Sequence, residues 1–244
     1  MGLNARKVKN TGGNTGPKQE PIEPGSYPCR LVQVLDLGLQ PQRPYQGQEK
    51  PPAHEIMLTY EFLDEFCLDE DGNELEDKPR WLSETMPLHS LEADRAKSTQ
   101  RYFAIDPDEV HEGDFTALVG MPCMVTVVQN QGKGKNADKI YQNIASVATM
   151  RPKEAKKAAE LVNPPKVFVL DEPDLEVFGS LPDWLQDKIK SNLEFKGSAL
   201  EEALEGDDEP KPKSKAKSKP QEDEDDVPFD TDEEEDEPEE DEFL

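Results

Sequence analysis

A lysine- and glycine-rich segment, residues 130–139, is the first candidate for binding chemistry in this sequence. It reads NQGKGKNADK and carries three lysines and one acidic residue. Glycine allows a ligand to approach the backbone closely, and lysine contacts phosphate groups. A solvated hairpin tip is the alternative that this segment alone leaves open. The residues proposed to contact phosphate or base here are Lys133, Lys135, Asn136 and Lys139.

Two aromatic residues on predicted strands could stack on nucleic-acid bases. Alternation places Lys139, Tyr141 and Asn143 on one face of a strand, with Ile140 and Ile144 on the other. In a second strand, Trp81 shares a face with Ser83 and Thr85. Base–aromatic stacking contributes about 1–3 kcal/mol per base and tolerates any sequence. A buried core tryptophan is the alternative interpretation of Trp81, and a shift of register by one residue would exchange the faces.

Other basic and aromatic residues extend this candidate path. They lie in the long polar connection at residues 40–52, beside Trp81, and in a predicted helix. The predicted additional contacts are Arg43, Tyr45, Lys50, Arg80, Lys97, Arg101 and Tyr102.

The elements that must position these residues form a predominantly β pattern. Five runs are rich in β-branched, aromatic or aliphatic residues and are bounded by Pro, Gly, Asn or Asp. These runs are 27–39, 54–66, 80–88, 122–129 and 139–150. The segment 90–105 lacks Gly and Pro and predicts a helix between the third and fourth strands. This order matches an OB-fold, a five-stranded barrel whose strand 2–3 face and L12 and L45 loops bind oligonucleotides.

Composition divides the rest of the chain. The 244 residues carry 28 Lys+Arg and 54 Asp+Glu, a net charge of -26, and only 34% are hydrophobic. We expect a flexible basic arm at 1–26, an OB-fold domain at 27–152, a helical extension at 153–205 and a disordered acidic tail at 206–244. In the extension, 153–161 predicts a short helix. A second helix at 180–195, capped by Ser180, should dock on the barrel or on another subunit through Leu181, Trp184, Leu185, Ile189 and Leu193.

The acidic tail contains sparse apolar residues, which a merely solubilising tail does not need. Residues 222–244 hold 16 acids and no base. One aromatic anchor can fill a partner's pocket while acids steer onto its basic rim. The predicted partner-binding residues are Asp225, Asp226, Val227, Pro228, Phe229, Asp241, Glu242, Phe243 and Leu244. Either Phe229 or Phe243 could be the anchor.

With these features together, the chain resembles phage-encoded single-stranded-DNA-binding proteins that combine an OB-fold with an acidic C-terminus. The resemblance covers about residues 22–200 and is carried by YPCRLVQVLDLG (27–38), KPRWLSE (78–84) and MPCMVTVV (121–128) with the Gly-Lys-Gly-Lys hairpin. It implies sequence-tolerant coating of single strands in phage replication, recombination and repair, in the host cytoplasm. It also implies a tail that recruits replication proteins and competes with DNA for the groove.

Two other functions stay open at this point. The charge of -26 suits an acidic interaction protein, such as a DNA mimic or a chaperone of basic proteins, and nine acids without a base at 61–77 add to it. Abundant carboxylates also leave a metal-dependent nuclease possible, although no catalytic, metal or cofactor motif is present. The Asp71-Gly72 region predicts a hairpin turn rather than a calcium loop. No membrane span is evident, and the sequence does not decide between a monomer and a homodimer.

Overall fold

The computed structural model describes residues 20–44, 46–137 and 139–207. Its strands are β1 (Gly25–Gln40), β2 (Ala53–Leu68), β3 (Glu74–Pro87), β4 (Pro122–Gln131), β5 (Ile140–Thr149) and β6 (Lys166–Phe168). Its α-helices are α1 (Lys97–Ile105), α2 (Pro152–Ala155), α3 (Leu175–Gly179), α4 (Asp183–Lys190) and α5 (Ala199–Asp207). Short 3-10 turns, η2 and η3, span Thr116–Leu118 and Gly134–Asn136. The predicted mainly β class is confirmed.

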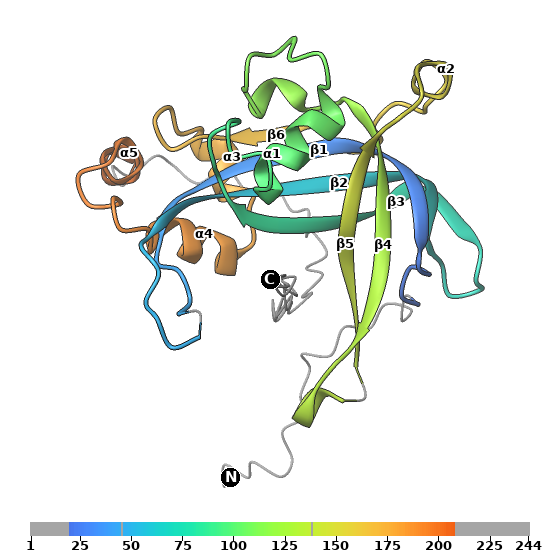
Figure 1. The fold of residues 1–244 in the computed structure, drawn as a ribbon, viewed down its shortest axis with the longest axis horizontal. Helices are drawn as coiled ribbons and strands as arrows, with labels where there is room; N and C mark the ends of the chain where they lie inside the picture. The colour runs from blue at the N-terminus through green and yellow to red at the C-terminus, as the bar shows by residue number, and fades with distance from the viewer. Residues whose placement is uncertain (1–19, 45, 138, 208–244) are drawn as a thin grey trace, which may run out of the picture. The chain divides into compact units, whose positions relative to one another are not determined.

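One sheet contains all six strands in the order β3-β2-β1-β4-β5, with β6 paired to β1 (Figure 1). β6 runs parallel to β1, and the other pairs are antiparallel. β3 and β5 lie at the two ends of this order, and α1 contacts both strands. Each of the five predicted strands is present. The largest difference from the predicted lengths is in β3, which begins at Glu74 and not at residue 80.

The two faces of β1–β3 serve different cores. The inner face buries Leu31, Leu58, Tyr60 and Phe62 together with Tyr102 of α1. The outer face carries Leu35, Leu37 and Met57, which lie under the elements that follow β5. Because successive side chains of a strand point to opposite faces, neighbours such as Val34 and Leu35 enter separate cores.

The helical extension forms the second core on this outer face. Its buried residues are Phe168, Phe178, Leu181, Leu185, Ile189 and Leu200. Gly38 of β1 has a φ of +75°, and a Cβ there would collide with Leu170 and Asn192 of the extension. Leu181, Leu185 and Ile189 of the predicted apolar stripe are buried in this second core together with Leu35, Leu37 and Met57 of the sheet.

Three helix predictions need correction. The single helix predicted at 180–195 is two helices, since Ser180 ends α3 and Pro182 precedes α4, where its fixed φ suits a helix start. Trp184 and Leu193 are 53% and 55% exposed, so they are not part of the packed stripe. The helices predicted at 90–105 and 153–161 are shorter in the structure, where they correspond to α1 and α2.

The first of these shortened helices begins only at Lys97. Before it, the Ser90 backbone carbonyl accepts hydrogen bonds from Ala93 N and the Thr99 hydroxyl, and the Ser90 hydroxyl accepts one from Glu92 N. Such local bonds let serine and threonine compete with helix formation. The helix α5 was not predicted.

No helix within the described ranges is both long enough and apolar enough to cross a membrane.

Candidate functional site

A row of polar side chains and one tryptophan crosses the outer face of β1, β2 and β3. The register pairs Gln33 with Thr59 and Thr59 with Ser83, and it places Trp81 opposite Glu61. The hydroxyls of Thr59 and Ser83 are 2.9 Å apart, and Gln33 Nε2 donates to Thr59 Oγ1 at 3.4 Å. Trp81 is 48% exposed. We call Gln33, Thr59, Trp81 and Ser83 the outer row.

The outer row confirms the predicted alternation of β3. Trp81, Ser83 and Thr85 share the outer face, while Glu84 and Met86 are buried on the inner face. Trp81 is therefore not a core tryptophan. Its side chain is available to a ligand on a face that also offers hydroxyl and amide groups.

A segment that follows β5, residues 158–166, crosses the same face, and we call it the strap. Arg30 of β1 donates to the carbonyls of Ala158 and Ala159 in the strap, at 3.1 and 2.6 Å, and to that of Gly120. Glu61 of β2 accepts from Val162 N at 2.7 Å, from Asn163 N at 3.1 Å and from Asn163 Nδ2 at 2.6 Å. Two charged residues that are neighbours in the sheet thus fix the strap.

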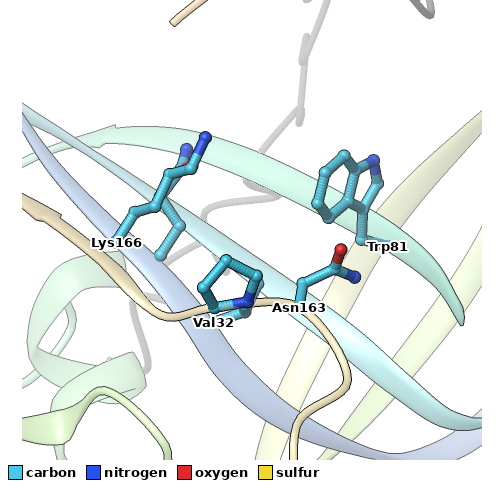
Figure 2. Close-up of a pocket in the computed structure, with 6 residues that line it drawn as sticks. Val32, Trp81, Asn163 and Lys166 are labelled. Atoms are coloured by element: carbon cyan, nitrogen blue, oxygen red, sulfur yellow. The ribbon is translucent and has the colours of Figure 1, made fainter. Parts of the chain in front are cut away.

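Between the strap and the outer row lies a pocket of about 160 Å³. Its lining consists of Val32, Gln33, Trp81, Asn163, Pro164 and Lys166. Figure 2 shows Trp81 and Lys166 on opposite sides of this pocket, with Val32 and Asn163 between them. The pocket combines an aromatic wall, apolar surface, two carboxamides and one ammonium group.

The predicted basic hairpin is the connection between β4 and β5, and it projects away from β1–β3 (Figure 1). Lys133 and Lys139 are exposed there, Asn136 is half-buried, and the Lys135 side chain lies outside the described structure. A Cβ at Gly132 would collide with the Asn136 carbonyl, so the tight turn requires glycine. None of these hairpin residues lines the Trp81 pocket.

Tyr141 is half-buried, and its ring lies against Gly132 at the base of the hairpin. Its hydroxyl is buried and has no hydrogen-bond partner within the described structure. A β-bulge between Thr126 and Val127 changes the phase of β5, so Ile144 and Val147 are both buried. Ile140, predicted to share the face of Ile144, is 47% exposed at the hairpin.

The prediction that Arg101 and Tyr102 contact DNA directly is wrong, because both side chains are buried. Arg101 forms a two-point ion pair with Glu84 of β3, at 2.8 and 3.1 Å, and its Nη2 reaches the Ile144 and Ala145 carbonyls of β5. Burial alone would lower the pKa of Arg101, but the hydrogen bonds and charge of Glu84 hold that pKa above its ordinary value. Arg101 therefore stays cationic and ties β3 to β5 through α1.

Tyr102 has an equally structural role. Its hydroxyl donates to Asp106 Oδ2 at 3.0 Å and accepts from Gly113 N at 2.7 Å. Burial is the largest cause that raises the pKa of Tyr102, and the neighbouring Asp106 raises it further. The hydrogen bond from the Gly113 amide lowers this pKa but does not cancel the increase, so the phenol stays protonated. These contacts fix the loop after α1.

The remaining predicted contacts are dispersed. Lys97 pairs with the buried carboxylate of Glu84 at 3.2 Å. Burial, reinforced by neighbouring carboxylates, raises the pKa of Glu65 and Tyr27, and the half-buried Arg80 nearby partly opposes both shifts. Arg43 and Lys50 are exposed in the β1–β2 connection. Tyr45 and the predicted tail residues (225–229 and 241–244) lie outside the described residues.

The acidic segment at 61–77 contains the predicted hairpin turn. Asp69 Oδ1 accepts from Asp71 N and Asn73 N at 2.9 and 2.8 Å, and Gly72 has a φ of +83°. These amides lower the pKa of Asp69, Asn73 contributing most. Within the ranges described, no group of three or more His, Cys, Asp or Glu side chains is arranged to hold a metal ion.

Sequence reasoning missed Gln33, Thr59, Asn163 and Lys166. Gln33 and Thr59 are polar residues inside otherwise apolar strand runs, and that signal could have identified them. No local pattern marks the strap, because its position depends on contacts with Arg30 and Glu61 more than 100 residues earlier.

Comparison with known proteins gives no match of this chain to a family model, to a curated protein or to a solved structure.

Proposed function

We propose that this protein binds single-stranded DNA without strong sequence preference, and that its main contact surface is the part of the outer face of β1–β3 that carries the outer row. The observation that carries the proposal is the half-exposed Trp81 in a polar row on β3, beside a pocket with Lys166 on its far side. An indole stacks on any base, and a lysine neutralises phosphate. The proposed function is binding, without catalysis.

We further propose that β1–β5 form an OB-fold barrel. The order β3-β2-β1-β4-β5 and the helix between β3 and β4 support this assignment. The Glu84–Arg101 pair supports it too, since it links the two end strands of the sheet. In OB-folds, the strand 2–3 face and the L12 and L45 loops bind oligonucleotides. Here the corresponding regions are the outer row, the Arg43–Lys50 connection and the β4–β5 hairpin.

The net charge of -26 is compatible with this function when the cations are concentrated locally. Lys133 and Lys139 are exposed at the hairpin, and Lys166 lies across the pocket from Trp81. Glu61, which lies opposite Trp81 in the sheet, accepts three hydrogen bonds and is buried. Its charge is therefore shielded from a bound strand.

The test is a titration of the full-length protein with oligo-dT in a gel-shift or filter-binding assay at several salt concentrations. We expect binding that weakens as salt increases, because phosphate contacts release counterions. The same titration of a protein that lacks the acidic residues 208–244 distinguishes a single-stranded-DNA-binding protein from a DNA mimic. A mimic would show no affinity for oligo-dT in either form, and that result would refute the proposal.

We also propose that the acidic tail competes with DNA and recruits partner proteins through Phe229 or Phe243. A tethered polyanion has a high effective concentration at a nearby basic surface. Because α5 extends to Asp207 and Leu200 is buried, the chain should be cut after Asp207. The shortened protein should bind oligo-dT more tightly than the full chain at low salt, with a smaller difference at high salt. Weaker binding after truncation would contradict the competition.

A further inference from the structure

We infer that the strap and Trp81 together form a subsite for one nucleotide, in which a base stacks on Trp81 and its phosphate contacts Lys166. The inference rests on the proposed function and deepens it, because it adds a wall from the segment after β5 to a site otherwise built from the sheet. The size of the pocket supports this inference, since a volume of about 160 Å³ limits the group that enters it to about one base.

The walls of the pocket have the chemistry that a stacked base requires. Trp81 offers an aromatic surface that is only half-covered by protein. Pro164 and Val32 add apolar contact along the rest of the lining. Stacking on such a surface does not depend on the identity of the base.

Asn163 presents an acceptor to the edge of that base. Its Nδ2 donates to Glu61 Oε2 at 2.6 Å, which fixes the orientation of the amide. The Asn163 oxygen therefore lies on the opposite side of the carboxamide, and Figure 2 shows it directed toward the Trp81 side of the pocket. Every natural base carries at least one N–H donor on its pairing edge, so this contact adds affinity with little selectivity.

Lys166 supplies the ammonium group of the pocket. Lys97 and Lys188 form ion pairs with Glu84 and Glu55, at 3.2 and 2.8 Å. Among the residues that the structure describes, no carboxylate pairs with Lys166. Its backbone is held by the parallel pairing of β6 with Gln33 of β1. The backbone of Lys166 is therefore fixed across the pocket from Trp81, with the side-chain charge available to a phosphate.

Glu61 is a positioning residue for this subsite. It touches no part of the proposed ligand, but its carboxylate accepts all three N–H groups that hold Val162 and Asn163. A glutamine at position 61 would turn one acceptor oxygen into a donor facing these groups. Val162 and Asn163 would then be held less firmly, and Asn163 would lose its fixed orientation, while Arg30 still binds Ala158 and Ala159.

The decisive experiment compares Lys166→Ala, Lys166→Arg and Lys196→Ala in oligo-dT titrations of the full-length protein over a range of salt. Lys196 is an exposed lysine outside the pocket and serves as the matched control. Lys166→Ala should weaken binding and reduce the magnitude of the log–log salt slope by about 1, while Lys166→Arg restores the slope. Lys196→Ala should leave the affinity and the salt slope unchanged.

A second measurement uses dT oligonucleotides with one 2-aminopurine, whose fluorescence is quenched on stacking. Asn163→Ala and Glu61→Gln should reduce the quenching and weaken binding by about 3–10-fold. If these variants and Lys166→Ala bind like the unmodified protein while Trp81→Ala does not, the subsite is wrong and the proposed function stands. If the unmodified protein itself fails to bind oligo-dT, the subsite and the proposed function are both wrong.

Discussion

Replacing Trp81 by alanine should weaken binding of oligo-dT by about 5- to 150-fold, the range that corresponds to loss of one base stack. The substitution removes the only aromatic ring that lines the pocket while leaving the inner core intact, because Trp81 points away from it. A filter-binding isotherm of each protein gives the ratio of dissociation constants.

Trp184→Ala is the matched control for this prediction. Trp184 is 53% exposed, close to the 48% of Trp81, but it lies on α4 and not in the outer row. Its replacement should change the dissociation constant by less than about twofold, because it removes no proposed stacking contact. Equal losses in the two variants would mean that exposed aromatic surface, and not the Trp81 site, determines binding.

Replacing Glu84 by alanine should lower the free energy of unfolding by about 3–5 kcal/mol, because it leaves the buried cation of Arg101 without its carboxylate. The Glu84 side chain also accepts a hydrogen bond from the Tyr60 hydroxyl at 3.0 Å, which would lose its partner. In the unmodified protein, burial and then Glu84 raise the pKa of Tyr60 well above the ordinary value, so the Tyr60 phenol is protonated and donates to Glu84. Urea unfolding followed by circular dichroism measures the change.

Glu76→Ala is a suitable comparison, since Glu76 is an exposed carboxylate on the same strand. Its removal should change stability by no more than about 0.5 kcal/mol. A loss below about 1 kcal/mol for Glu84→Ala would show that the link between β3 and β5 through α1 contributes little to the fold.

The strands of this protein could be predicted from sequence because their residue patterns are local. Trp81, Ser83 and Thr85 alternate with Leu82, Glu84 and Met86, and the structure places the two sets on opposite faces. The helices were predicted less well. Ser180 and Pro182 both suit a helix start, but Ser180 closes α3 and only Pro182 stands directly before α4.

The candidate site was predicted in part for the same reason. Trp81 and the hairpin lysines belong to recognisable strand and turn patterns, and the structure leaves their side chains accessible where it describes them. Arg101 is predicted to contact DNA as one of the basic residues of the helix, yet a buried carboxylate on β3 holds its side chain inside. Lys166 could not be found, because only the pairing of β6 with β1 brings it to the pocket.

The most direct test of the account is the fluorescence of Trp81 itself during titration with oligo-dT. In a Trp184→Phe variant, Trp81 is the only tryptophan of the chain. The account predicts saturable quenching of its emission by oligo-dT, reversed by added salt, with a midpoint that matches the filter-binding isotherm. Binding of oligo-dT without any change in Trp81 emission would contradict the account, because it would place the DNA on another surface.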